Sequence, residues 1–499
     1  MKSTSIYRFL LIVILGLFIG NLIAQEKKPN IIYILADDLG YGDVSCLNEK
    51  SKIKTTNIDS LARSGMRFTD AHSNSSVCTP TRYGIMTGRY AWRSKLKSGV
   101  TWSYDSALIE PNRKTVASLL KQEGYTTACI GKWHLGLDWD KDSNGNIDLF
   151  KPIKRGPTTM GFDHFFGITA SLDIPPYVYI RNDRITATSI DTIKANTGKG
   201  FWRKGPVGND FKHEEVLSTF INASVNFIRE QSKKQQPFFL YLPLAAPHTP
   251  ILPTSAYKGK SGTNEYGDFV LMMDDMIGMI IDEVRKAGIE ENTMIVFTSD
   301  NGCSPQANFK ELEAVGHNPS YMFRGAKADI YEGGHRIPFI VKWPNMVKPN
   351  TTCEKTISLT DFFATIVEVN KQAVEDISGE DSYSILPLLK GYKKAYKRKD
   401  VVHHSIEGNF AIRKGKWKLE FCPGSGGWSY PTPSETESLL LPPFQLYNMK
   451  SDKGEQHNVS SKHPGIVRSL SILMQEHIDR GRSTPGLPQK NTLPLELLR

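Results

Sequence analysis

The sequence has little of what marks several common protein classes. Its six cysteines include no Cys-x-x-Cys pair, so their spacing gives no support for a zinc site or a thioredoxin-like redox motif. No internal repeat and no long low-complexity segment interrupts the 499 residues. No helix-turn-helix, zinc-finger or RNA-binding signature is present, so nucleic acid is not an expected partner.

Long apolar runs are also scarce. The run 9–23 follows a positively charged start, but Gly16, Gly20 and Asn21 dilute it, and a membrane span needs about 20 predominantly apolar residues. We therefore predict a secretory signal peptide over residues 1–24, export to the periplasm or beyond the cell, and no membrane anchor after cleavage. Disulfides are permitted in an exported protein, although these cysteine positions do not define a pairing.

The overall composition is that of a large globular protein with more basic than acidic residues. The chain is 39% hydrophobic and 23% charged, with a net charge of +10. That balance is compatible with an anionic partner. The densest basic run, residues 390–399, could meet a polyanion, but such a run is more often a solvated surface segment.

Buried-strand patterns alternate with helical patterns along most of the chain. The expected strands are 31–35, 125–130, 237–244 and 293–299, and the expected helices are 58–64, 114–123, 213–233 and 268–287. This alternation predicts an α/β fold with a large, mostly parallel sheet flanked by helices over residues 25–385. Residues 386–499 are predicted to form a smaller subdomain, an antiparallel sheet plus a helix at 464–480.

Acidic side chains follow two of the expected strands. Asp37 and Asp38 end the first, and Asp300 and Asn301 end another. In open parallel sheets, ligands bind beyond the carboxyl ends of the strands. Three carboxylates and an amide oxygen favour Ca²⁺ or Mg²⁺ over zinc. One Asp-Asp pair alone would more often be a turn or a cap, but two such pairs favour a metal site.

Cationic side chains occupy the loops at the same predicted edge. Arg82, Lys132, His134, His248 and Lys327 each lie in a segment bordered by glycine or proline. Singly, each would more often be an exposed lysine or a satisfied histidine. Together they could grip a tetrahedral oxyanion through charge-assisted hydrogen bonds.

Cys78 has three interpretations. It could be a small buried hydrophobe, or a thiolate nucleophile at the start of a helix, where the dipole lowers a thiol pKa. Three residues, with Pro80 among them, separate Cys78 from Arg82, whereas thiol-dependent phosphatases usually have five with glycines between. The third interpretation depends on a resemblance.

The stretch "CTPTR" (78–82) followed by "YGIMTGRY" resembles the signature of the type I sulfatases, whose cysteine is oxidised to Cα-formylglycine by a separate maturation enzyme. Other segments resemble family blocks in family order over about 29–344: "PNIIYILADDLGYGD", "GYTTACIGKWHLG", "PFFLYLPLAAPHTP", "VFTSDNG" and "RGAKADIYEGGHRIPFIVKWP". The family belongs to the alkaline phosphatase superfamily, which implies the same α/β architecture.

The resemblance implies a role for each candidate residue. Asp37, Asp38, Asp300, Asn301 and modified residue 78 match ligands of Ca²⁺, with Mg²⁺ as the alternative. Arg82 matches the arginine that steadies the aldehyde hydrate, and Lys132, His134, His248 and Lys327 match residues that hold sulfate and move protons. Ser171, in the looser block "GITASLDIPPY", matches a sulfate-contacting serine. One hydroxyl of the hydrate would attack sulfur and the other would then expel sulfate.

The expected substrate is a sulfated glycan, with marine algal polymers such as ulvan or carrageenan as the leading candidates. Loops 390–399 and 422–431 could line the sugar subsites, with Trp428 or Tyr430 as a platform, although packed aromatics are commoner. A phosphodiesterase or phosphonate monoester hydrolase of the same superfamily is the nearest alternative, and a catalytically silent glycan-binding protein is another.

One further loop, "DKDSNGNID" (140–148), resembles a calcium loop. Its twelfth position is Lys151, where a bidentate glutamate is expected, so a surface turn is favoured over a second ion site.

Overall fold

A computed structural model describes residues 27–436 and 438–497 of the chain. The predicted signal peptide, residues 1–24, lies outside the described residues. Within them, no helix combines the length and the apolar character needed to cross a bilayer. All six cysteines fall in the described part and are free thiols.

The centre of the molecule is a ten-stranded sheet, in the order β13-β2-β12-β11-β1-β10-β4-β5-β6-β7. Strand β1 (Asn30–Asp37) lies at its middle, parallel to β10 (Phe238–Pro247) and β11 (Thr293–Ser299). Strand β4 (Thr126–Lys132) pairs in parallel with β10 and with β5 (His164–Ile168). The mostly parallel α/β sheet is therefore confirmed.

Antiparallel strands are confined to the outer parts of this sheet. On one side β12 (Phe339–Lys342) runs antiparallel to both β11 and β2 (Met66–Phe68). At the other edge β6 (Ile180–Arg181) and β7 (Arg184–Ile185) are antiparallel, and β13 (Thr351–Cys353) pairs in parallel with β2. Two separate two-stranded sheets pair β3 (Ala71–His72) with β14 (Ile357–Ser358) and β8 (Ile190–Ile193) with β9 (Gly205–Gly208).

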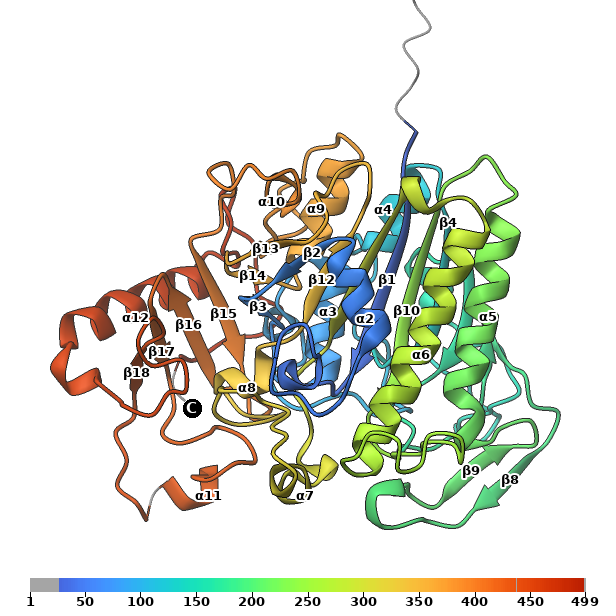
Figure 1. The fold of residues 1–499 in the computed structure, drawn as a ribbon, viewed down its shortest axis with the longest axis horizontal. Helices are drawn as coiled ribbons and strands as arrows, with labels where there is room; N and C mark the ends of the chain where they lie inside the picture. The colour runs from blue at the N-terminus through green and yellow to red at the C-terminus, as the bar shows by residue number, and fades with distance from the viewer. Residues whose placement is uncertain (1–26, 437, 498–499) are drawn as a thin grey trace, which may run out of the picture.

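Helices cover both faces of the sheet (Figure 1). The alternation of side chains along β1 sends Ile32 and Ile34 into one core and Tyr33 and Leu35 into the other, as expected for a strand buried on both faces. The helices of the first core are α2 (Thr56–Arg63), α5 (Val216–Gln231) and α6 (Glu265–Lys286), and those of the second are α3 (Cys78–Thr87), α4 (Val116–Gln122), α9 (Asp361–Val369) and α10 (Leu386–Leu389). Three short helices, α7 (Phe309–Ala314), α8 (Glu332–His335) and α11 (Pro433–Thr436), lie in connecting loops.

The smaller C-terminal unit is the predicted antiparallel sheet with its helix. Its strands β15 (Asp400–His404), β16 (Phe410–Lys414), β17 (Trp417–Glu420) and β18 (Gln445–Asn448) are adjacent in chain order, and α12 (Pro464–Asp479) packs on them. Tyr90 and Trp92, just after α3, belong to its hydrophobic core. The unit therefore packs directly against the segment that follows the helix beginning at Cys78.

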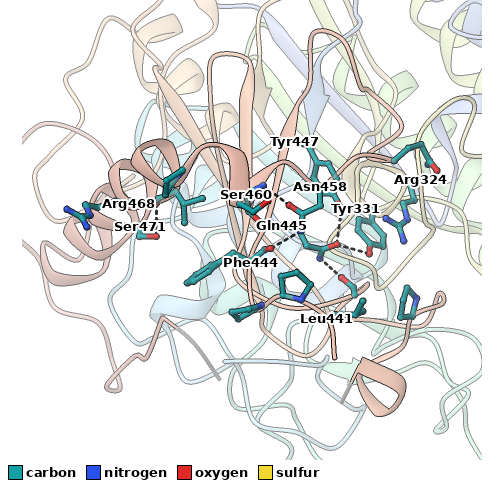
Figure 2. A pocket seen from close by; sticks show the side chains of 18 residues that line it. Arg324, Tyr331, Leu441, Phe444, Gln445, Tyr447, Asn458, Ser460, Arg468 and Ser471 are labelled. Atoms are coloured by element: carbon teal, nitrogen blue, oxygen red, sulfur yellow. Dashed lines mark hydrogen bonds between the residues drawn. The ribbon is translucent and has the colours of Figure 1, made fainter. Parts of the chain in front are cut away.

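A cavity of about 770 Å³ lies between β18, α12 and the loop around residues 441–444 (Figure 2). Many of its polar groups are already used: Gln445 Oε1 accepts hydrogen bonds from Tyr331 and Tyr447, and its amide donates to two carbonyls. This cavity is distinct from the cluster of ionised side chains described next.

Candidate active site

Four neighbouring parallel strands bring most of the predicted site residues to one edge. Asp37 ends β1, and Asp38 follows it. Asp300 and Asn301 follow β11, His248 follows β10, and Lys132 ends β4. Because these strands are adjacent and parallel, their carboxyl ends converge, and all six side chains are buried.

The acidic residues are each contacted by a predicted cation. Lys132 Nζ lies 2.6 Å from Asp37 Oδ2, and Lys327 Nζ lies 2.7 Å from Asp38 Oδ1. The fully buried Arg82 donates to Asp300 Oδ2 at 2.8 Å and to the carbonyl of Lys132 at 2.8 Å. Buried charges need such pairing, since an isolated ion in the interior costs several kcal/mol (about 3–5 when one partner is removed).

These contacts move the acid pKa values in opposite directions. Burial alone would raise the pKa of Asp37, but Lys132, His248 and Arg82 lower it well below its ordinary value. Burial and the charge of Asp37 raise the pKa of Asp300 to about 7, in spite of Arg82. Crowded carboxylates of this kind are typical of sites that hold a further cation.

Cys78 is the first residue of α3, and its side chain is buried within electrostatic reach of this cluster. Burial raises the pKa of its thiol, and the opposing charges of Lys132 and Lys327 do not reverse that shift. The thiolate-nucleophile interpretation therefore loses support, since a reactive cysteine needs a depressed pKa. The loop of Lys327 packs beside it, because the Ala328 N–H donates to the Ser76 carbonyl at 2.8 Å.

Hydrogen bonds fix the orientation of the two predicted histidines. His134 Nε2 is 2.8 Å from the Thr101 carbonyl and must donate to it, which leaves Nδ1 as a proton acceptor. That Nδ1 is buried without a hydrogen-bond partner among the described residues, and burial lowers the pKa of His134 well below 6.5. His248 Nδ1 donates to the Thr249 carbonyl, so its Nε2, 3.6 Å from Asp38 Oδ2, is the atom free to exchange a proton.

Backbone conformation at the cluster is strained in three places. Asp38, His134 and Ala328 have φ values of 65°, 56° and 80°, in the left-handed region that costs about 1 kcal/mol or more for a residue with a Cβ. Gly302 serves a different need, because a Cβ there would lie 1.8 Å from the Gly333 carbonyl oxygen. This close approach ties the Asp300 loop to the segment that carries Lys327.

Ser171 has no direct hydrogen bond to the other candidates among the described residues. It is buried in the loop after β5, two residues from Thr169, whose carbonyl accepts a hydrogen bond from the His134 N–H. Across the described chain, however, its side chain makes no hydrogen bond or ion pair with the other ten predicted residues. A sulfate-contacting role for Ser171 stays a prediction.

The oxygen atoms at the strand ends fit a divalent cation. Asp37 Oδ1 and Asn301 Oδ1 are both buried and lack a hydrogen-bond partner in the described part of the chain. Asp37, Asp38 and His248 offer possible ligand atoms that all lie within 4.8 Å of one another. Unpartnered hard oxygen atoms in a buried site suit Ca²⁺ or Mg²⁺.

In the loop 140–148, which resembles a calcium loop, the acidic side chains are hydrogen-bonded or ion-paired to nearby residues. Asp142 Oδ1 accepts the backbone N–H groups of Asn144 and Asn146, and Lys154 Nζ pairs with Asp140 at 2.8 Å. Lys151 Nζ donates to the carbonyl of Lys141 at 2.6 Å. The geometry is that of the favoured surface turn, with lysine ammonium groups where an ion would need oxygen ligands.

Two supporting networks were not anticipated from the sequence. The first holds the loop after Asp38: Tyr266 donates to Asp43 Oδ2 at 2.5 Å and to the Asp38 carbonyl at 3.3 Å, and His317 contacts Asp43 Oδ1 at 2.8 Å. Asp43 belongs to the family-like segment 29–43, but Tyr266 and His317 come from distant parts of the chain.

The second network joins the C-terminal sheet to the segment of Lys327. Lys418 on β17 is fully buried, and its Nζ lies 2.6 Å from Glu455, 3.1 Å from Glu420 and 3.5 Å from Glu332. It also donates to the Ile330 carbonyl at 2.9 Å. The Lys418 ammonium group thus lies among three buried carboxyl groups, one of which, Glu332, is also paired with Arg336, and it holds the chain three residues after Lys327.

Three buried histidines adjoin this second network. His72, His335 and His403 have ring nitrogens within 4.8 Å of one another, a grouping that could suggest a metal site. The rings of His335 and His403 are stacked at 3.9 Å and 10°, so their in-plane lone pairs cannot converge on one ion. Lys418 Nζ lies 3.1 Å from His335 Nε2, which further disfavours a cation. Burial lowers the pKa of all three rings, so they are neutral at neutral pH.

Comparison with known proteins defines the class that this fold and site belong to. The sulfatase family model matches residues 29–370, well over half of the chain, so the protein belongs to the sulfatase family of the alkaline phosphatase superfamily and is a sulfuric ester hydrolase. A second model, the C-terminal region of N-sulphoglucosamine sulphohydrolase, matches residues 325–422.

Individual relatives are similar over nearly the full length. An N-acetylgalactosamine-6-O-sulfatase of Bacteroides thetaiotaomicron is 34% identical, covering 90% of this chain and 93% of its own. The N-acetylgalactosamine-6-sulfatase of Rattus norvegicus is 27% identical, covering 93% and 88%. A solved structure described as a 6S-sulfatase in glycosaminoglycan metabolism by Bacteroides thetaiotaomicron superposes with a TM-score of 0.81 at 32% identity, covering 90% of this chain and 99% of that one.

Proposed function

We propose that the protein is an exported sulfatase that removes 6-O-sulfate from an N-acetylgalactosamine residue of a sulfated glycan. The observation that carries the chemistry is the buried cluster at the strand ends, where Arg82, Lys132 and Lys327 meet Asp37, Asp38 and Asp300 beside Cys78. The 6-O position is supported by the names of the relatives that are similar over nine-tenths of the chain.

Residue 78 is proposed to act as a formylglycine hydrate, made from Cys78 by a separate maturation enzyme. One hydroxyl of the hydrate would attack sulfur and become sulfated. Loss of the proton from the second hydroxyl would then re-form the aldehyde and expel sulfate, so that water need not attack a crowded, anionic sulfate ester. A bound divalent ion, Ca²⁺ or Mg²⁺, would supply positive charge and lower the pKa of that hydroxyl. Asp37, Asp38, Asp300 and Asn301 would hold the ion.

The remaining roles follow from the protein's own contacts. Lys132 and Lys327 place two ammonium groups where negative charge gathers on the transferring group. His248 Nε2 is the proton donor to the departing alcohol, because its Nδ1 is held by Thr249. His134 Nδ1 is the proton acceptor for residue 78, because it is buried, neutral and unpartnered among the described residues. Arg82 fixes Asp300 and the end of β4.

Replacing His248 with glutamine is expected to affect sugar sulfates far more than aryl sulfates. A sugar alkoxide needs a proton to leave, whereas 4-nitrophenolate does not, so the loss of kcat should be about 10²- to 10⁴-fold for the first and much smaller for the second. The measurement is kcat for both substrates, with the thermal midpoint as a check on folding. Equal losses on both would remove His248 from the acid role.

Removal of divalent ions is expected to inactivate and destabilise the protein together. Without an ion, the buried carboxylates repel one another, and binding should stabilise the fold by about 2.7 kcal/mol at a free concentration about 100 times Kd. The test is thermal unfolding and activity after dialysis against EDTA, then with Ca²⁺ or Mg²⁺ added back, beside elemental analysis. Metal-free protein with full activity and an unchanged midpoint would contradict the ion site.

Substrate choice is tested by sulfate release from a panel. It should contain 6-sulfated N-acetylgalactosamine and galactose saccharides, their 4-sulfated isomers, ulvan, carrageenan and an aryl phosphate diester. We expect release from the 6-sulfated sugars. Release from ulvan or carrageenan alone would favour the algal alternative, faster cleavage of the phosphate ester the phosphodiesterase alternative, and binding without any release the silent glycan-binding protein.

A further inference from the structure

A groove of about 810 Å³ lies beside the candidate active site. One wall is the loop between β8 and β9, with Lys199, Phe201 and Arg203, and the other is the segment around α7, with Phe309 and Lys310. Figure 1 shows the β8–β9 hairpin and α7 at the same end of the molecule, beyond the carboxyl ends of the parallel strands. The groove therefore opens where a substrate chain would leave the site.

Both walls are attached directly to the predicted catalytic residues. The Lys199 carbonyl accepts hydrogen bonds from Thr249 Oγ1 and the Ile251 N–H, both at 2.9 Å, just after His248. The opposite wall follows Asp300 and Asn301 in the chain, and the Lys327 N–H donates to the Cys303 carbonyl at 2.9 Å. A ligand in the groove would thus begin beside His248.

Phe201 and Arg203 line this groove, and Trp102 lies directly beside Arg203. The Arg203 guanidinium lies 5.1 Å from the ring centres of both Trp102 and Phe201. Trp102 is 49% exposed, although it follows Thr101, which contacts His134. An exposed indole beside a buried catalytic residue is a flat surface on which a sugar ring can stack, and aromatic residues exposed beside a site commonly mark recognition.

The basic side chains that line the groove differ in how free they are to bind an anionic ligand. Lys199 is held by Glu265 and Glu311, so it adds little free positive charge. Arg203 uses one nitrogen, Nη1, for Asp173, and within the described chain its Nε and Nη2 have no hydrogen-bond partner. Lys310 is exposed at the other wall. Arg203, whose charge is paired with Asp173 but whose Nε and Nη2 can still donate, and Lys310 therefore lie on opposite walls of the groove.

We propose that this groove binds the sugar residues adjoining the sulfated one, and that it selects a chain whose neighbouring sugar carries an acidic group. Trp102 stacks on a pyranose ring, and Arg203 and Lys310 pair with a carboxylate or a second sulfate of the neighbour. The inference rests on the proposed glycan sulfatase function. It predicts a preference for alternating acidic glycans over neutral galactans that bear a single sulfate.

The test compares Trp102→Ala and Lys310→Gln with wild type on three substrates: 4-nitrophenyl sulfate, a 6-sulfated tetrasaccharide with hexuronic acid neighbours, and one with neutral neighbours. Trp102→Ala should lower kcat/KM for both tetrasaccharides by about tenfold, and Lys310→Gln only for the acidic one, by about threefold, with the aryl ester unchanged. Arg203→Lys, which keeps the charge near Asp173, should weaken the acidic preference. Tyr392→Ala, an exposed aromatic near α10 at the other end of the sheet, is the matched control and should change nothing.

Binding separates this inference from the proposed function. Calorimetry of the two tetrasaccharides with Cys78→Ala and with its Trp102→Ala double variant needs no turnover. A weaker affinity in the double variant would support glycan binding in the groove, whether or not the wild type releases sulfate. A lack of sulfate release by the wild type would count only against the proposed sulfatase function. Equal affinities, or equal effects of Trp102→Ala on the aryl ester and the tetrasaccharides, would overturn the groove assignment.

Discussion

Replacing Cys78 with alanine is expected to abolish turnover and leave the fold intact. Without residue 78 no nucleophile remains, so activity should fall by at least about 10⁴-fold, as when a nucleophile is removed from other enzymes. The side chain is small and packs at the first position of α3, so the free energy of unfolding should change by only about 1 kcal/mol. The measurements are sulfate release and urea unfolding.

Cys353→Ala is the matched control, because Cys353 is equally buried but lies on the edge strand β13. It should lose some stability and keep full activity. Mass spectrometry of the tryptic peptide 68–82 provides the second readout, and an active wild-type preparation should carry an aldehyde at residue 78. An unmodified thiol in fully active protein would contradict the formylglycine proposal.

The position of the site could be predicted because its residues follow regular elements. Apolar runs of strand length ending at Asp37, Lys132 and Asp300 had to be buried, and adjacent parallel strands present their carboxyl ends on one edge. The start of α3 at Cys78 could also be predicted, since proline is favoured in the first turn of a helix and Pro80 lies there. These local signals were sufficient to gather the acids and cations in one place.

The outer strands and the supporting networks could not be predicted in the same way. Strand β12 runs antiparallel between β11 and β2, and the direction of a short apolar strand has no signature in its own residues. Lys418 lies in a basic run typical of a solvated hairpin, yet it is fully buried. Glu420 is on the same strand, but Glu332 and Glu455 converge on Lys418 from distant segments. Such convergence is a property of the tertiary fold alone.

The two unanticipated networks have a common consequence for the site. The loop of Asp38 is held by Tyr266 through Asp43, and the loop of Lys327 is held by Lys418 through Ile330. Each reactive segment is thus fixed by a buried polar contact from another part of the chain, which is how a strained backbone at Asp38 and Ala328 persists. The C-terminal sheet therefore belongs to the active-site scaffold.

Replacing Lys418 with methionine is expected to be strongly destabilising. Methionine fills the volume but leaves Glu455 and Glu420 without their cation, whereas Glu332 keeps its pairing with Arg336, and breaking a buried ion pair costs about 3–5 kcal/mol. Turnover by the protein that remains folded should also fall, because the Ile330 carbonyl, close to Lys327, loses its charged donor and keeps only the contact with His335. The measurements are the urea midpoint and kcat, with Lys121→Met, a half-exposed lysine on α4, as the control expected to change neither.

The destabilisation by Lys418→Met should depend on pH with a definite sign. Burial raises the pKa of Glu455 and of Glu420 even in the presence of Lys418. Removing the Lys418 ammonium group should raise both pKa values further. A carboxyl whose folded pKa exceeds its unfolded value binds its proton more readily in the folded state, so its contribution to stability is present at low pH and is lost as pH rises. The difference in unfolding free energy between variant and wild type should therefore shrink as pH falls from about 8 to about 5. A difference that is constant across this range, or that grows on acidification, would show that Lys418 does not neutralise these carboxylates.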